Sequence, residues 1–273
     1  MSFSVYIPAR YGSTRLPGKP LRDLAGKPLI QHVFERAVES GAGTIIIATD
    51  DDRIRACGEG FGAKVCMTSA DHTSGTDRIA EAAALLGEEE ETVIVNLQGD
   101  EPCMPAQAIR QVAGLMGETG DAEIATLCVP LLDPKELFDP HVAKVVLNQQ
   151  GHALYFSRAP IPWHRDGFIE TRAVERLPAH AGYYRHIGLY AYRARFLQRF
   201  SRSPICPLEQ VEHLEQLRAL YYGFQIRIAV AEVPVEMGID TPYDLERIRR
   251  LLARPAINGI TDTSGQVHDR LSE

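Results

Sequence analysis

The chain has 273 residues, of which 45% are hydrophobic and 24% charged, close to the averages of globular proteins. Its length allows one or two domains and a core that needs neither disulfides nor a metal to hold it together. The 29 Lys and Arg against 36 Asp and Glu give a net charge of −7, which argues against a general binder of nucleic acid or anionic membranes.

The sequence also carries no sign of secretion or of membrane insertion. No apolar run approaches the roughly 18 residues that a membrane span needs. The first residues, MSFSVYIPAR, lack the basic and long apolar regions of a signal peptide. The five cysteines form no CxxC pair and no zinc spacing, so we expect reduced thiols in a cytoplasmic protein.

The first half of the chain alternates predicted strands and helices. Continuous apolar runs predict strands, and apolar residues at helical spacing predict helices. In chain order, strands are expected at 3–8, 44–51, 63–69 and 92–97, with helices at 29–38, 52–61 and 76–86 between them. This alternation is typical of an α/β fold, a mostly parallel sheet with helices on both faces.

After about residue 123 the predicted strands follow one another more closely. Strands are expected at 123–129, 144–150, 152–158 and 186–193, followed by a helix at about 208–222, a strand at 226–233 and a helix capped by Thr241. Gly151 suits a hairpin turn. We expect one domain over 1–252, with about 130–190 as an inserted β-rich segment for substrate binding or dimerisation, and a loosely ordered tail over 253–273.

The loop after the first predicted strand, ARYGSTRLPGKP, combines three cations with glycines. In open α/β sheets, ligands bind beyond the carboxyl ends of the strands. Glycines let backbone N–H groups approach phosphate oxygens, and Arg10, Arg15 and Lys19 match the charge of a polyphosphate. The spacing is neither a Walker A motif nor GxGxxG. A solvated turn with surface cations is the alternative, and the position after the first strand favours phosphate.

Two acids stand where a metal could be held. Asp100 follows the fourth predicted strand, opposite the phosphate loop, and such a carboxylate can hold a nucleotide-bound Mg²⁺. It could instead cap the helix that follows Pro102. Asp240 is the second acid, although the TPYD segment explains its turn without a metal. The acids at 50–52 form a rival group, which we interpret as strand-end and helix-start acids.

Seven segments together resemble the sugar-activating cytidylyltransferases. They are IPARYGSTRLPGKPL, ADHTSGTDR, VNLQGDEP, YFSRAPIPW, RHIGLYAYR, PLEQVEHLEQLR and GIDTPYDL, in this order over about residues 3–250. Within that family, the resemblance is to members that use 3-deoxy-manno-octulosonate (Kdo), an anionic eight-carbon sugar. It implies a nucleotidyltransferase-type α/β sheet, a homodimer, Mg²⁺, CTP and Kdo as substrates, and a product used for lipopolysaccharide.

The resemblance also implies a reaction and the residues that serve it. The reaction is transfer of CMP from CTP to the anomeric hydroxyl of Kdo, with release of pyrophosphate. Asp100 and Asp240 would hold Mg²⁺, and together with Arg15 and Lys19 they form the implied catalytic set. The implied nucleotide-binding residues are Ala9, Arg10, Ser13, Arg15, Lys19, Ser74, Arg78 and Gln98. The implied sugar-binding residues are Arg78, Gln98, Arg158, His186, Glu209, Glu212 and Gln216.

Several of these residues have a structural alternative. Ser74 lies in a segment that suits a helix N-cap, and a lone His such as His186 is more often structural than catalytic. On the predicted helix at 208–222, the polar residues at 209, 212 and 216 share one face, a pattern that is also typical of a solvated surface. The apolar stripe of this helix is expected to be Leu208, Val211, Leu214 and Leu217. Asp77 stands where the family usually has Glu, which makes a role for residue 77 doubtful.

Two other functions compete with Kdo activation. A related cytidylyltransferase that activates sialic acid or an 8-amino analogue of Kdo would share the phosphate loop and differ in its sugar-binding residues. A non-catalytic nucleotide-sensing or sugar-binding module would be expected to lack a metal-binding Asp or Lys19. Asp100, Asp240 and Lys19 are all present, which favours an enzyme.

Overall fold

The computed structural model describes residues 2–13, 16–118, 122–168, 174–178 and 182–252. Among these, nine strands form one sheet in the order β11-β7-β10-β6-β1-β4-β5, with β8 pairing with β10 and β9 with β8. The strands are β1 Ser4–Ala9, β4 Thr44–Thr49, β5 Lys64–Met67, β6 Val93–Asn96, β7 Ile124–Pro130, β8 Lys144–Leu147, β9 Ala153–Ser157, β10 Tyr184–Arg193 and β11 Ile226–Val230. Two short strands, β2 Asp23–Leu24 and β3 Lys27–Pro28, pair separately.

Most neighbouring strands of the central sheet run parallel. β1 pairs in parallel with β4 and β6, β4 with β5, and β11 with β7, whereas β10 is antiparallel to β6 and β7. All six residues of β1 are buried, as expected for a strand whose two faces are both covered. The predicted α/β class and mostly parallel sheet are therefore confirmed.

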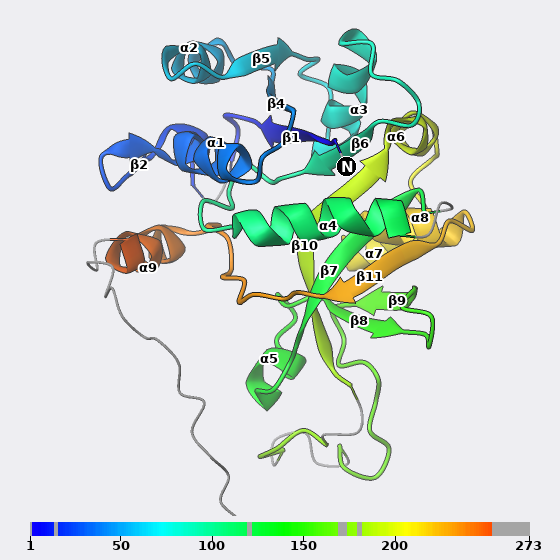
Figure 1. Ribbon diagram of the computed structural model, residues 1–273. Coiled ribbons are helices and arrows are strands. Elements are labelled where there is room, and N and C mark those ends of the chain that lie inside the picture. The colour runs from blue at the N-terminus through cyan, green and yellow to red at the C-terminus, as the bar shows by residue number, and fades with distance from the viewer. Residues whose placement is uncertain (1, 14–15, 119–121, 169–173, 179–181, 253–273) are drawn as a thin grey trace, which may run out of the picture.

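Helices cover both faces of the sheet. Successive side chains of a strand point to opposite faces, so Val5 and Ile7 pack in one core and Tyr6 in the other. The first core includes side chains of α1 (Leu29–Glu39), α2 (Asp52–Gly60), α4 (Ala106–Glu118) and α9 (Pro242–Leu252). The second includes α3 (Gly75–Leu85), α6 (Ala194–Ser201) and α8 (Gln216–Tyr221). Figure 1 shows α1 and α4 in front of the strands.

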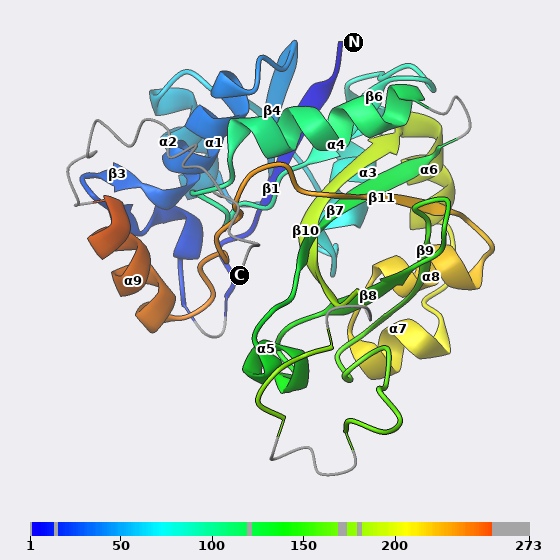
Figure 2. The same ribbon diagram turned by 60° about the horizontal axis from the view of Figure 1, so that its bottom comes forward.

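Part of the inserted segment is described. It contains α5 (Pro134–Phe138) and the β8–β9 hairpin, whose Gly151 adopts a φ of +78°, a backbone conformation that favours glycine. A small separate cluster is buried there, formed by Leu131, Leu137, Val142, Phe168 and Tyr183. Figure 2 shows α5 and this segment below the sheet, on the side where β10 leaves it. Residues 169–173 and 179–181 lie outside the described residues, as does the predicted tail at 253–273.

The single helix expected at 208–222 is wrong. The structure has two short helices, α7 (Pro207–Glu212) and α8, separated by His213 with a φ of +50°. The guanidinium of Arg158 donates to the carbonyls of Glu212 (2.7 Å) and His213 (3.4 Å), carbonyls that a continuous helix would use itself. The break also divides the expected apolar stripe, because Leu217 is fully buried but Val211 is 81% exposed.

The start of α9 follows its sequence signals closely. The backbone N–H of Asp244 donates to Thr241 Oγ1 (3.2 Å), and the N–H of Thr241 donates to the Asp244 carboxylate (2.9 Å), a reciprocal cap. Arg249 of α9 donates to the carbonyl of Asp23 in β2 (2.6 Å), and Figures 1 and 2 both show α9 beside the N-terminal elements. This packing brings the residues just before α9 to the phosphate loop.

Candidate active site

A polar cavity of about 330 Å³ opens at the carboxyl ends of β1 and β6. Its volume is within the range of small-molecule sites. Residues from four separate parts of the sequence line it, among them these predicted site residues: Ala9, Arg10, Ser13, Lys19, Ser74, Arg78, Gln98, Asp100 and Asp240. Arg15 lies outside the described residues. The sequence patterns therefore identified side chains that the fold brings into one cavity.

Asp100 and Asp240 meet at the ammonium group of Lys19. Lys19 Nζ donates to Asp100 Oδ2 (2.8 Å), to Asp240 Oδ1 (3.0 Å) and to the carbonyl of Ile239 (2.8 Å). Burial lowers the pKa of Lys19, but the two carboxylates outweigh this effect and the pKa is raised. Three oxygens around one cationic atom are the donor type that Mg²⁺ prefers, so these residues fit the implied metal.

The capping and turn roles that the sequence allows for Asp100 and Asp240 do not account for the contacts of their carboxylates. Thr241 and Asp244 cap α9, while the Asp240 carboxylate accepts a hydrogen bond from Lys19. Helix α4 begins only at Ala106, and the Asp100 carboxylate also contacts Lys19. No group of three or more His, Cys, Asp or Glu side chains is placed to hold a metal in the described ranges.

Gly99 fixes the position of Asp100 relative to the phosphate loop. A Cβ atom at residue 99 would lie 2.7 Å from the carbonyl oxygen of Pro8, far too close for any side chain. The loop after β6 can therefore lie directly against the end of β1. Next to Asp100, burial and the Asp100 carboxylate raise the pKa of Glu101 to about 8. No sequence pattern singled out Glu101, whose carboxylate lies against Gly238, a residue distant in the sequence.

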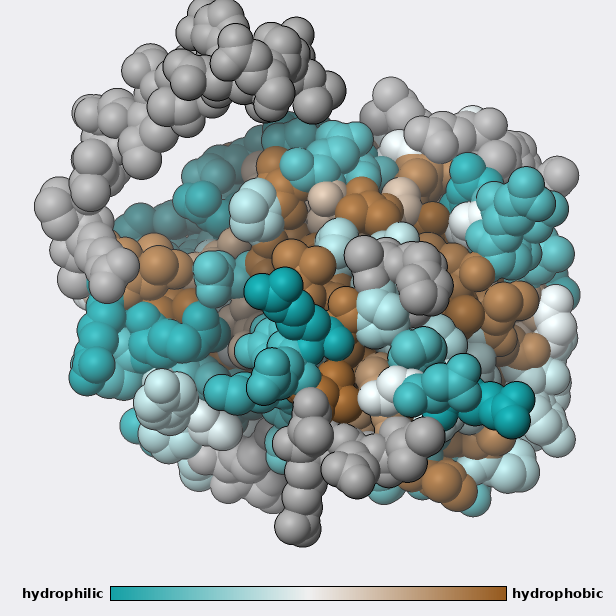
Figure 3. Space-filling model, turned by 90° about the horizontal axis from the view of Figure 1, so that it is seen from below, coloured by the Kyte–Doolittle hydropathy of each residue, from teal (hydrophilic) through white to brown (hydrophobic). Residues whose placement is uncertain are grey.

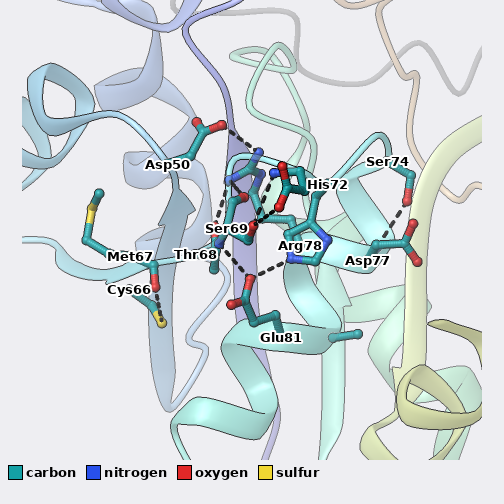
Figure 4. A network of polar contacts seen from close by, with 12 residues as sticks. Asp50, Cys66, Met67, Thr68, Ser69, His72, Ser74, Asp77, Arg78 and Glu81 are labelled. Carbon is teal, nitrogen blue, oxygen red and sulfur yellow. Dashed lines mark hydrogen bonds and ion pairs between the residues drawn. The ribbon is translucent and has the colours of Figure 1, made fainter. Parts of the chain in front are cut away.

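Arg78 holds one wall of the cavity in place. Its side chain is only 3% exposed, and it donates to Asp50 Oδ2 (3.1 Å), Thr68 Oγ1 (2.7 Å) and the carbonyl of Ser69 (3.4 Å), as Figure 4 shows. These contacts fasten the loop at 68–75 to the end of β4. Arg78 therefore borders the cavity mainly as a support for this loop.

Ser74, in the same loop, combines the predicted cap with a place in the cavity. Its Oγ accepts the backbone N–H of Asp77 (3.0 Å) as the N-cap of α3. His72 also lines the cavity and contacts Glu81 (2.5 Å), although it was not among the predicted site residues (Figure 4). Among the rival acids, Asp51 caps α2 by accepting the N–H of Arg53 (2.9 Å), as interpreted from the sequence.

A second, smaller cavity of about 50 Å³ lies beside Thr76, at the N-terminus of α3. Glu215 and Gln216 line it, together with Tyr190 and other apolar and aromatic side chains. Glu215 Oε1 and Gln216 Nε2 are buried there without a hydrogen-bond partner in the described part of the chain. Unsatisfied buried polar atoms are rare, and they indicate a place for a polar ligand or water. Gln216 was predicted, but Glu215, its neighbour in the same motif, was missed.

Three other predicted sugar residues contact one another or nearby side chains. Arg158 donates to the carbonyls of Pro140, Glu212 and His213. Glu212 accepts Ser157 Oγ (2.6 Å) and the N–H of Arg158 (2.9 Å), whereas Glu209 is bound to Arg218. The assignment of Arg158 to sugar binding stays a prediction, and these three carbonyls occupy three of the five N–H donors of its guanidinium.

His186 is held as a neutral side chain. Burial, and to a smaller extent Arg185, lower its pKa to about 3. The hydroxyl of Thr126 donates to backbone carbonyls, so its oxygen accepts the Nε2–H of His186 over 3.1 Å. The ring packs against Phe156 and Tyr190. His186 can therefore hydrogen-bond a sugar hydroxyl but cannot supply a positive charge at neutral pH.

The partly buried Glu215 predicts a pH dependence of stability. Burial raises its folded-state pKa from 4.5 to about 7, so the folded protein holds this proton more tightly than the unfolded chain does. The stabilisation is complete below pH 4.5 and is lost as the pH rises through 7. Over this window, the free energy of unfolding should fall more steeply for the wild type than for Glu215→Gln, measured by urea unfolding at stepped pH. A constant difference between the two proteins would contradict this.

The fold and cavity define a class of protein. A cationic loop after the first strand, facing two carboxylates at the edge of a mostly parallel sheet, is typical of enzymes that bind a nucleoside triphosphate with a divalent metal. A family model described as cytidylyltransferase matches residues 5–228. In the described residues, no helix is long and apolar enough to cross a membrane.

Comparison with similar proteins shows which enzymes of this class the chain resembles. "3-deoxy-manno-octulosonate cytidylyltransferase" of Nitrosococcus oceani is 54% identical over 92% of this chain and 97% of its own, and that of Coxiella burnetii is 54% identical over 91% and 99%. A solved CMP:2-keto-3-deoxy-manno-octonic acid synthetase complexed with CTP is 41% identical, with a TM-score of 0.82 over 93% of this chain and 99% of its own. The chain belongs to the cytidylyltransferase family and, within it, to the 3-deoxy-manno-octulosonate cytidylyltransferases.

Proposed function

We propose that the protein transfers CMP from CTP to the anomeric hydroxyl of Kdo. The hydroxyl oxygen attacks the α-phosphorus, the bond from that phosphorus to the bridging oxygen breaks, and pyrophosphate leaves with the electron pair of that bond while the hydroxyl proton passes to water. The observation that carries this proposal is the convergence of Asp100, Asp240 and Lys19 in a cavity that also contains Arg10, Ser74 and Gln98. The names of the relatives support CTP and Kdo as the substrates.

The residues of the cavity would have different roles in this reaction. Arg10 and Lys19 would neutralise negative charge that grows on the departing pyrophosphate. Ser74 and the loop at 68–75, fastened by Arg78, would hold the base and position the α-phosphate. Asp100 and Asp240 would hold Mg²⁺, which when bound polarises the α-phosphate and lowers the pKa of the attacking hydroxyl.

The second cavity supports a sugar site next to the nucleotide site. Gly75 lines the first cavity and Thr76 the second, so the two are adjacent at the start of α3. Glu215 Oε1 and Gln216 Nε2 are buried there without a hydrogen-bond partner among the described residues. We infer that these two side chains bind hydroxyl groups of the sugar. The neutral His186 would bind the sugar with them, because its ring packs against Tyr190, which lines the same cavity.

A pyrophosphate-release assay tests the proposal. The purified protein with Mg²⁺ is given CTP, UTP, ATP or GTP with Kdo, and then CTP with Kdo, its 8-amino analogue or sialic acid. The highest kcat/KM is expected for CTP with Kdo. A higher value for sialic acid or for the amino analogue would favour the related sugar-activating enzyme. Absence of pyrophosphate release with every pair would favour a non-catalytic nucleotide-binding module.

We also propose that the protein acts in the cytoplasm as a homodimer, supplying an activated sugar for lipopolysaccharide. Support for the dimer comes from large apolar side chains at and near the inserted segment, with Leu132 82% and Leu154 59% exposed. Figure 3, seen from that side, shows hydrophobic patches on this face. Leu154 lies on β9, which pairs only with β8 among the described strands and so leaves an open edge.

The dimer predicts a definite mass in solution. Light scattering at micromolar concentration should give about twice the chain mass of 30.2 kDa. Leu154→Lys, which places a charge on the open edge, should shift that mass toward the monomer. A wild-type mass equal to that of one chain would contradict the dimer.

A further inference from the structure

The ammonium group of Lys19 lies in a closed set of oxygen acceptors. An ammonium has three N–H donors, and three acceptors surround this one: Asp100 Oδ2, Asp240 Oδ1 and the carbonyl of Ile239, at 2.8 to 3.0 Å. The side chain is 13% exposed. Every donor of Lys19 is therefore engaged in this structure.

This arrangement gives Lys19 two roles that it cannot fill at the same time. The phosphate loop offers Lys19 to the triphosphate, but its ammonium cannot donate to phosphate oxygens without leaving at least one of these three acceptors. Two of the three acceptors are the carboxylates that would hold the divalent metal. An ammonium and a metal ion that bind the same two oxygens, Asp100 Oδ2 and Asp240 Oδ1, compete for them.

We propose that Lys19 is an internal cation that occupies the metal site in the nucleotide-free protein, and that it moves to the triphosphate when nucleotide binds and so vacates the site for the divalent ion. The inference rests on the proposed function, because it takes Asp100 and Asp240 as the metal-binding acids. Without a cation between them, the two carboxylates would repel each other, and Lys19 removes that repulsion before any ligand arrives.

Two consequences follow for binding. In the nucleotide-free protein, a divalent ion must displace the ammonium, so its affinity is low. Once the triphosphate draws the ammonium away, the affinity rises, and by linkage the metal raises the affinity for the nucleotide by the same factor. Lys19 would thus couple the two ligands and favour binding of the nucleotide before the metal that lies between the acids.

Titration with Mn²⁺ in the absence of nucleotide tests the first consequence. Binding is followed by the electron paramagnetic resonance signal of free Mn²⁺, for the wild type, Lys19→Met and Lys19→Arg. Lys19→Met should bind Mn²⁺ more tightly than the wild type, within the range of roughly 5- to 150-fold typical of coupled sites. Lys19→Arg keeps the positive charge and should bind Mn²⁺ less tightly than Lys19→Met does. Equal or weaker binding by Lys19→Met would overturn the proposal.

Matched variants show whether the gain in affinity is specific to the loss of Lys19 from between the two acids. Lys27→Met removes a lysine that pairs with Glu35 on the surface (2.7 Å), away from the cavity, and should leave Mn²⁺ binding unchanged. Lys19→Gln replaces Lys19→Met if the latter fails to fold, which circular dichroism would reveal. The double variant Lys19→Met/Asp100→Asn should lose the gain in affinity. A gain that persists in it would place the ion elsewhere and would contradict both this proposal and the metal assignment.

The failure of this proposal and that of the proposed function give different results. If the wild type binds Mn²⁺ in a manner that depends on Asp100, but Lys19→Met binds it no better, the metal-binding acids stand and the exchange is wrong. A final comparison adds CTP at one concentration to both proteins. CTP should raise the Mn²⁺ affinity of the wild type more than that of Lys19→Met, since chelation by the nucleotide itself is common to both. An equal increase in the two proteins would overturn the exchange.

Discussion

Asn in place of Asp100 or of Asp240 is expected to lower kcat by at least about a hundredfold while the protein stays folded. Asn has nearly the size of Asp but no charge, so each change removes half of the carboxylate pair that meets at Lys19. In the proposed reaction, that pair would hold the divalent cation, which would supply positive charge at the α-phosphate. Pyrophosphate release at saturating CTP and Kdo measures the effect.

The matched control is Asp52→Asn. Asp52 pairs with Arg55 on α2 (3.0 Å) and its side chain is 78% exposed, so its loss of charge should leave kcat unchanged. Thermal melts of all three variants would show whether the fold is intact. Turnover near that of the wild type in either Asp100→Asn or Asp240→Asn would remove that residue from the metal site.

Met in place of Arg218 is expected to lower the free energy of unfolding by about 3–5 kcal/mol, the cost of breaking a buried ion pair. Arg218 is 3% exposed and forms two hydrogen bonds with the Glu209 carboxylate, at 2.6 and 2.7 Å. Its guanidinium also lies 4.0 Å from acid oxygens of Asp77 and Glu215. Removal of this one cation would leave three acids without their shared positive partner. Urea unfolding at pH 7.5 measures the loss.

Two comparisons show whether burial is the cause. Arg250 pairs with Glu246 on the surface of α9 and is 77% exposed, so Arg250→Met should cost no more than about 0.5 kcal/mol. The double variant Arg218→Met/Glu209→Gln should be less destabilised than the sum of its two single changes, because no unpaired charge remains at residue 209. A loss for Arg218→Met as small as that for Arg250→Met would contradict the prediction.

The sequence predicted the parts of the fold that local patterns determine. The apolar runs at 44–51 and 92–97 correspond to β4 and β6, and the expected helix at 29–38 to α1, each within a few residues. Lys19 and Asp100 were also predicted to lie near each other, because loops at the carboxyl ends of parallel strands meet at one edge of the sheet. Asp240 was assigned to the same site by the family resemblance.

The break between α7 and α8 could not be predicted, because its cause is distant in the sequence. Arg158 takes the carbonyls of Glu212 and His213 from a position more than fifty residues earlier in the chain. A helical pattern read along 208–222 contains no information about such a donor. In the broken helix, Glu209 binds Arg218, and Glu215, which was not predicted, lines the second cavity.

The place of β10 has a consequence for how the chain folds during synthesis. β10 lies between β6 and β7 in the sheet, yet it follows both in the sequence. A nascent chain that has emerged only as far as β7 therefore holds the four strands β5, β4, β1 and β6, which can pair with one another, and β7, which has neither of its partners, β10 and β11. Exposed edges are sites of mispairing and aggregation. These strands can become one cooperative sheet only after residues 184–193 have been synthesised. The nascent chain is therefore prone to mispairing and aggregation until the inserted segment has been made.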